Sequence, residues 1–211
     1  MSGRFCLVAL FSEDFLDDTI KVIERIDRAS IEAVVGILES TRQANGRLFV
    51  CGSGGGAGHA SHATCDFRKL CGFEAYSITD NVSELTARTN DDGWDSSYSN
   101  WLTASRIRKG DCLFVFSVGG GSIEPPVSVN LVNAMQTAKS NGARVVGVVG
   151  RNGGALKTIA DACVLIPTVS AGFVTPQAEG LQAVVWHLIV SHPRLAASVA
   201  KWEGLDQPAN V

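Results

Sequence analysis

Two segments of the 211-residue chain carry histidine and carboxylate side chains at helical spacing. His62 and Asp66 are four residues apart, so they share one face of a predicted helix. Glu179 and His187 interrupt a second helical segment that is otherwise apolar. Two histidines and two carboxylates can bind a metal ion or transfer protons. Each of these residues alone is more often a hydrogen-bonded core residue or a solvated one, so their function depends on how the fold places them.

Two glycine-rich segments follow predicted strands and could hold an anion. They span residues 52–58 (GSGGGAG) and 117–122 (SVGGGS). Glycine lets the backbone approach a ligand closely, and free N–H groups at the start of a helix attract negative charge. Ser53, Ser117 and Ser122 add hydroxyl donors. The first loop matches neither GxGxxG nor GxxxxGK[ST], so a phosphorylated small molecule is favoured over a nucleotide. The alternative is that these glycines only form tight turns.

The elements that must position these segments alternate between apolar runs and helical patterns. Continuous apolar runs are typical of parallel strands covered on both faces. Strands are predicted at 47–52, 112–117, 144–150 and 162–167, with a short fifth strand near 74–78. Helices are predicted within 12–44, in two pieces, and at about 57–70, 94–107, 127–141, 154–160 and 176–191.

This order predicts an α/β fold, a three-layer α/β/α sandwich with a central parallel sheet. We expect one domain, with an N-terminal helical region at about 12–44, an α/β core at about 45–192 and a ragged polar tail at 193–211. Ligands of such sheets bind at the carboxyl ends of the strands, where both glycine loops fall. A third loop at 152–154 is expected to be only a turn before a helix.

Composition excludes several classes of protein. Apolar residues make up 45% of the chain and charged residues 18%, which is not the pattern of a disordered protein. The formal net charge of −3 argues against a nucleic-acid partner. No apolar run approaches the length of a membrane-spanning helix. Six cysteines without a CxxC pair indicate reduced, buried thiols, so we expect a cytoplasmic protein without a membrane partner.

Five ordered segments resemble those of one protein family. They are CGSGGGAGHASH (51–62), LTARTNDDGW (85–94), FSVGGGS (116–122), VVGVVGRNGG (145–154) and TPQAEGLQAVVWH (175–187). Over about residues 15–192 the chain resembles the SIS-domain phosphosugar isomerases, most closely the phosphoheptose isomerases. The resemblance implies an aldose–ketose isomerase that converts sedoheptulose 7-phosphate to D-glycero-D-manno-heptose 7-phosphate through an enediol(ate), for heptose and surface polysaccharide biosynthesis. It also implies a homotetramer with active sites at subunit interfaces.

The resemblance also assigns roles to individual residues. It implies Zn²⁺ held by His62, Asp66, Glu179 and His187, with Asp66 as the general base and His187 as the general acid. It places the sugar hydroxyls near Asn90 and Asp91, and it places the phosphate on the two glycine loops. The implied phosphate-binding residues are Ser53, Gly54, Gly55, Ser117, Gly119, Gly120 and Ser122.

Departures from the family pattern qualify the implied site. Asp66 stands where the family has Glu, Glu179 where it has Gln, and about six extra residues lie within 123–130. Glu179 and His187 are separated by roughly 12 Å along a straight helix, too far to share one ion. Either Glu179 lies in a flexible first turn, or His187 completes a site in a neighbouring subunit. The alternative function is a non-catalytic SIS module that binds a sugar phosphate or a protein partner, but the chemically intact acid–base set favours an enzyme.

Overall fold

The computed structural model describes residues 3–205, with the side chains of residues 10–202, 204 and 205. Its centre is a five-stranded sheet in which every pair of neighbouring strands is parallel. The strands lie in the order β2-β1-β3-β4-β5. They span β1 Leu48–Gly52, β2 Ala75–Ser77, β3 Cys112–Ser117, β4 Arg144–Val149 and β5 Ala162–Leu165, each within about two residues of its prediction.

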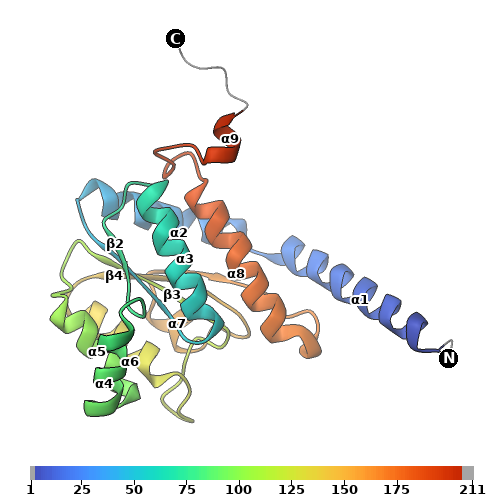
Figure 1. Cartoon of the computed structure of the whole chain (residues 1–211), viewed down its shortest axis with the longest axis horizontal. Coiled ribbons are helices and arrows are strands. Elements are labelled where there is room, and N and C mark those ends of the chain that lie inside the picture. Colours follow the sequence, from blue (N-terminus) through green and yellow to red (C-terminus); the bar gives the residue numbers. More distant parts are fainter. Residues whose placement is uncertain (1–2, 206–211) are drawn as a thin grey trace.

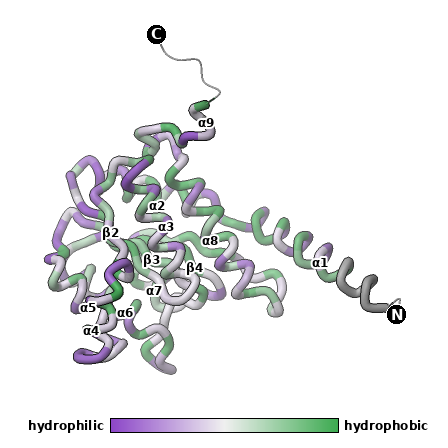
Figure 2. Tube along the Cα trace, in the orientation of Figure 1, coloured by the Kyte–Doolittle hydropathy of each residue, from purple (hydrophilic) through white to green (hydrophobic). Residues whose placement is uncertain are grey.

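Helices cover both faces of the sheet, which confirms the three-layer sandwich (Figure 1). Alternate residues of β1 divide between the faces: Val50 packs with α2, α3 and α8, and Phe49 packs with α5, α6 and α7. Figure 2 shows hydrophobic colour along the strands at the centre of the molecule. The helices of the two layers span α2 Arg28–Gln43, α3 Gly55–Lys69, α5 Trp94–Ala104, α6 Val129–Ser140, α7 Gly154–Ile159 and α8 Val174–Val190.

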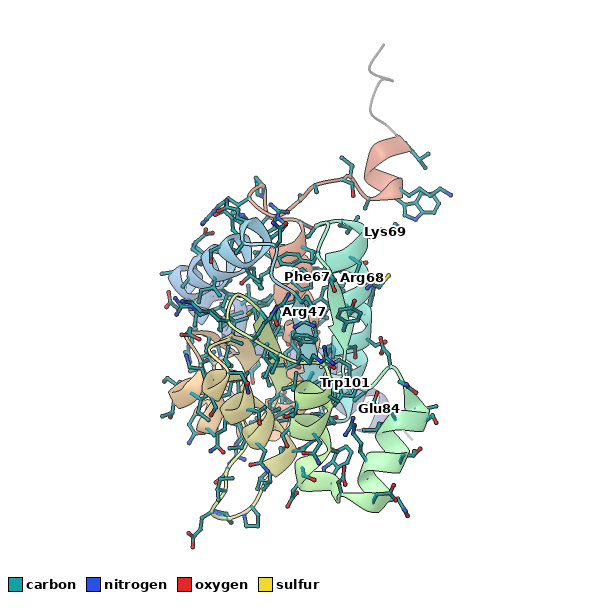
Figure 3. All side chains as sticks on the ribbon, turned by 90° about the vertical axis from the view of Figure 1, so that its left-hand side faces the viewer. Arg47, Phe67, Arg68, Lys69, Glu84 and Trp101 are labelled. Atoms are coloured by element: carbon teal, nitrogen blue, oxygen red, sulfur yellow. The ribbon has the colours of Figure 1, made fainter. Side chains whose placement is uncertain are left out.

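Helix α4 (Val82–Asp91) was not predicted, because it buries none of its residues. Local interactions stabilise it together with the partly buried Leu85, which packs against the core. The side chain of Asn81 accepts a hydrogen bond from the Glu84 amide at the start of the helix, and Arg88 forms an ion pair with Glu84 one turn earlier. Figure 3 shows Glu84 on this helix, in the lower part of the view, and Lys69 at the end of α3 in its upper part.

The expectation of a ragged tail is wrong for residues 193–198. Leu195 is fully buried, and Arg42 of α2 donates hydrogen bonds to the carbonyls of Arg194 and Leu195. The amides of Ala197 and Ser198 bond to the Leu70 carbonyl at the end of α3. A short helix, α9 (Lys201–Leu205), follows, and residues 206–211 lie outside the described part.

The first helix, α1 (Gly3–Arg25), projects away from the sheet (Figure 1). Its aromatic residues Phe11 and Phe15 contact Phe173, just before α8. Even so, it exposes large apolar side chains: Phe11, Leu16, Ile20 and Ile23 are each between 46% and 61% exposed. The projecting helix therefore leaves an apolar surface without a partner in the described chain.

The described cysteines form no disulfide. Cys51, Cys71 and Cys112 are buried as predicted, but Cys65 is exposed and the side chain of Cys6 lies outside the described part. Burial raises the pKa of Cys71 to about 11, which keeps its thiol protonated near neutral pH. Within residues 3–205, no helix is long and apolar enough to cross a membrane.

Candidate active site

Helices α3 and α8 bring three of the predicted metal-binding side chains together. The rings of His62 and His187 are 5.4 Å apart between centroids, and His62 Nε2 lies 3.9 Å from Asp66 Oδ2. One ligand atom from each of His62, Asp66 and His187 lies within 4.8 Å of the others. His187 therefore meets His62 and Asp66 of its own chain, so the expectation that His187 completes a neighbouring subunit's site is wrong for this group.

Packing and hydrogen bonding orient the two histidines. Trp186 is buried beneath them, with its rings 3.5 Å from His187 and 4.7 Å from His62 between centroids. His187 Nδ1 lies 2.8 Å from the Ala183 carbonyl oxygen. If Nδ1 carries the proton that bonds this carbonyl, Nε2 is left free as an acceptor or ligand. Two imidazoles and a carboxylate are a donor set that suits Zn²⁺ with one open position, so the residues present fit such an ion.

Glu179 lies apart from this group of three. Helix α8 is continuous from Val174, so Glu179 is not in a flexible first turn. Its carboxylate lies against Gly55, where a Cβ atom would be 2.6 Å from the Glu179 Cδ. The amino end of α3 carries partial positive charge, which favours a carboxylate at this position.

His59 also lies in the site, although the sequence prediction gave it no role. It precedes His62 by three residues on the face of α3 that faces α8, and its ring lies 5.9 Å from that of Phe116. Burial lowers the pKa of His59, and the backbone carbonyl and carboxylate of Glu179 partly oppose that shift. The spacing of three residues between His59 and His62 was the available signal. A neutral imidazole here can accept a proton.

A cavity of about 600 Å³ lies at the carboxyl edge of the sheet, where the loops after β1 and β3 converge. Ligands of this type of sheet bind at this edge, so the cavity is the candidate site for the predicted ligand. Ser53 and Ser117, predicted on separate loops, both line it. The other lining residues are Val118, Gly119, Val127, Ser128, Leu131, Arg151, Ala171, Val174 and Thr175.

Buried polar side chains hold the two serines of the cavity. Asn130, fully buried, donates a hydrogen bond from Nδ2 to Ser53 Oγ at 3.2 Å. Ser117 Oγ accepts a hydrogen bond from the Gly120 amide at 2.9 Å. Gln182 of α8, also fully buried, donates to the Ser117 carbonyl. Ser117 thus keeps its hydroxyl proton available for an anion in the cavity, whereas the Ser53 side chain also interacts with that of Tyr98.

Six other predicted residues do not line this cavity, and three of them are Gly54, Gly55 and Gly120 of the glycine loops. Ser122 lies in an adjoining hollow of about 480 Å³, and its hydroxyl donates to the Glu124 carbonyl. Asn90 and Asp91 lie in the last turn of α4, where the Asn90 amide donates to the Asp91 carboxylate at 2.7 Å. Figure 1 shows α4 on the far side of the molecule from α8. Roles for Asn90 and Asp91 stay predictions.

Comparison with known proteins identifies the family of the chain. Residues 14–150 match the family model described as SIS domain. The chain is 34% identical over 190 residues to the lincomycin biosynthesis protein LmbN of Streptomyces lincolnensis, covering 85% of this chain and 67% of that protein. It is 33% identical over 171 residues to the phosphoheptose isomerase of Mycobacterium tuberculosis, covering 76% and 84%.

Solved structures agree on the fold. The phosphoheptose isomerase of Neisseria gonorrhoeae superposes with a TM-score of 0.73 at 23% identity, covering 89% of this chain and 97% of the other. That of Francisella tularensis gives 0.72 at 20% identity, covering 91% and 100%. The ordered glycine loops, the parallel sheet and these relatives lead to one conclusion: the chain belongs to the SIS domain family, in the group that includes the phosphoheptose isomerases.

Proposed function

We propose that the chain is an aldose–ketose isomerase of a sugar phosphate, with sedoheptulose 7-phosphate as its substrate. The observation that carries the proposal is the layout of α3. Its amino end, at Gly55, follows Ser53 of the cavity, and its face toward α8 carries His59, His62 and Asp66. Gly55 and His62 are separated by roughly 10 Å along the helix. That spacing suits a long sugar phosphate, with its phosphate in the cavity and its carbonyl end at the histidines.

Proton transfer between C1 and C2 is the chemistry that this group supports. We propose that the Asp66 carboxylate removes the proton from one carbon and that His187 protonates the adjacent oxygen, giving the enediol(ate). The reverse transfers on the neighbouring atoms complete the isomerisation. Binding of the remote phosphate holds the reacting carbons in place for these transfers. The product would feed heptose and surface polysaccharide biosynthesis.

In their alternative role, as ligands and not as acid and base, His62, Asp66 and His187 would hold the proposed Zn²⁺. When bound, such an ion polarises a carbonyl oxygen and stabilises negative charge that develops on it. We expect elemental analysis of the purified protein to find about one zinc per chain, and chelation to lower turnover. His62→Ala should lose most of the metal, because the proposed site has only three protein ligands and two do not hold zinc tightly. Full activity in metal-free protein would contradict this prediction.

The decisive experiment for the function is turnover of sedoheptulose 7-phosphate, followed by NMR of the reaction mixture. We expect the aldose product with the phosphate retained, and exchange of the C2 hydrogen of that product with solvent deuterium. Unphosphorylated sedoheptulose is the matched control and should react far more slowly, because it leaves the cavity empty. Tight binding of the sugar phosphate without turnover would instead support the non-catalytic sugar-phosphate-binding module.

We propose in addition that the chain is a single domain that assembles as a homotetramer in the cytoplasm. The support is the apolar surface of α1 and a neighbouring apolar hollow of about 260 Å³ between α1, α2 and α8. Val184 and Leu188 of α8 line that hollow and are 52% and 43% exposed. Contiguous apolar surfaces of this kind mark interfaces between chains. Light scattering should give a mass about four times that of the chain.

A further inference from the structure

The cavity that holds Ser53 and Ser117 contains a single charged side chain. Of the lining residues, all of them within the described part, only Arg151 carries a formal charge. The hydroxyls of Ser53 and Ser117 are neutral donors, and Val118 and Gly119 offer only backbone N–H groups. A phosphate monoester carries close to two negative charges at neutral pH. Neutral donors alone leave most of that charge uncompensated.

The guanidinium of Arg151 is placed directly over the glycine loop. A Cβ atom on Gly119 would lie 3.9 Å from both Cδ and Nη1 of Arg151. Arg151 is exposed, and within the described chain its guanidinium makes no hydrogen bond or ion pair. Its five N–H donors are therefore free, in the fork geometry that matches phosphate oxygens.

Backbone contacts fix the position of Arg151 relative to the glycine loop. The amides of Ala155 and Leu156, at the start of α7, donate hydrogen bonds to the carbonyls of Gly121 and Gly120. The Gly153 amide bonds to the Gly150 carbonyl across a turn that contains Arg151. The loop after β4 is thus joined to the loop after β3, and residues 152–154 lead into α7 as the sequence indicated.

Arg151 also has an unfavourable backbone conformation. Its φ is +53°, in the left-handed region that residues with a Cβ rarely adopt. A glycine would fit this position without strain, and Gly150, Gly153 and Gly154 lie within three residues of it. Arg106 has the same φ away from the cavity, so the ligand role is indicated by the place of the Arg151 side chain over Gly119 and not by its backbone alone.

We infer that Arg151 binds the phosphoryl oxygens of the substrate and supplies the positive charge that the glycine loops lack. The inference rests on the proposed function, since it takes the ligand of the cavity to be a sugar phosphate. Arg151 acts in binding and positioning, and the proton transfers at the other end of the sugar do not involve it. Its loss therefore affects KM more than kcat.

The first test measures binding of inorganic phosphate by calorimetry, with the intact protein. Arg151→Gln should weaken binding about 10- to 100-fold, the range for a charge-assisted contact. Arg151→Lys should recover part of the loss, since it restores the charge without the fork. Arg106→Gln is the matched control: Arg106 is exposed, has the same φ of +53° and precedes β3 at the opposite edge of the sheet. It should bind phosphate like the wild type.

Arg151→Gly separates the ligand role from a structural one. It removes the side chain and relieves the left-handed conformation, so we expect a Tm no lower than that of the wild type together with lost phosphate affinity. Unchanged affinity in Arg151→Gln, equal losses in Arg151→Gln and Arg106→Gln, or a wild type that binds no phosphate would each overturn the inference.

Kinetics with sedoheptulose 7-phosphate distinguishes this inference from the proposed function. For Arg151→Gln we expect KM to rise about 10- to 100-fold with kcat within about threefold of the wild type. Turnover with an unchanged KM would overturn the role of Arg151 and leave the isomerase standing. A wild type that binds phosphate through Arg151 but does not isomerise the sugar would refute the isomerase and support the role of Arg151.

Discussion

Asp66→Asn is expected to lower kcat by about 10²- to 10⁴-fold, the contribution typical of a positioned acid or base. The amide has the same shape as the carboxylate but cannot accept the proton of the sugar. The Asp66 side chain is 17% exposed and lies beside His62, so the substitution changes the chemistry at little cost in packing. KM should change little, because the phosphate cavity lies at the other end of α3. Steady-state kinetics with sedoheptulose 7-phosphate measures both constants.

The zinc content of the Asp66→Asn protein distinguishes the two roles considered for Asp66. Metal retained with activity lost indicates a base, whereas metal and activity lost together indicate a ligand. Asp66→Glu should keep part of the activity, since it retains the carboxylate one methylene further out. Asp80→Asn makes the same chemical change at an exposed carboxylate outside the group of metal ligands, and we expect wild-type kinetics from it. A kcat for Asp66→Asn within threefold of the wild type would refute both roles.

Gly120→Ala is expected to destabilise the protein by about 3 kcal/mol, which combines left-handed strain with a steric clash. Gly120 has a φ of +79°, and its Cβ would lie 1.9 Å from the Gly153 carbonyl oxygen. The opposing atoms are backbone, so the two loops must separate. For a chain of this length, that cost corresponds to a Tm lower by about 6–12 °C. Thermal unfolding followed by circular dichroism gives the value.

Gly36→Ala is the matched control for this clash. Gly36 lies within α2, where the nearest atom to its Cβ would be Nη2 of Arg194 at 3.6 Å, an ordinary contact. Alanine is favoured over glycine in a helix by about 1 kcal/mol, so this variant should unfold at a slightly higher temperature. A Tm for Gly120→Ala equal to the wild type would mean that the loops do not pack as described.

The sheet was predictable from the sequence because its strands are buried on both faces. All six residues of β3 are buried, and a continuous apolar run is the direct consequence of that burial. Helix α4 shows the opposite case. With no buried residue it has no apolar periodicity to reveal it. The Asn81 cap and the ion pair that support it involve only a few polar residues, which are also common in loops.

The site was predictable where its residues lie on one helix or follow neighbouring strands that end at the same edge of the sheet. His62 and Asp66 are neighbours by helical spacing alone, and Ser53 and Ser117 follow strands that end at the same edge. The meeting of His187 with His62 depends on how α8 crosses α3, which spacing along one helix does not determine.

The positions of Arg151 and Glu179 could not be predicted from the sequence. Arg151 reaches the cavity through contacts between two loops, and the glycines around it favoured a simple turn. Glu179 faces the amino end of α3, although its place in the sequence suggested a metal ligand. Both positions are set by tertiary packing between segments far apart in the chain.

The proposed tetramer, with α1 between its subunits, would make the stability of the protein depend on its concentration. When neighbouring subunits cover Phe11, Leu16 and Ile20, as we propose, part of the free energy of folding comes from contacts between chains. Such contacts obey the law of mass action, so dilution shifts the equilibrium toward separate chains with an uncovered helix. At a temperature just below the melting point of a concentrated solution, dilution alone would then unfold the protein.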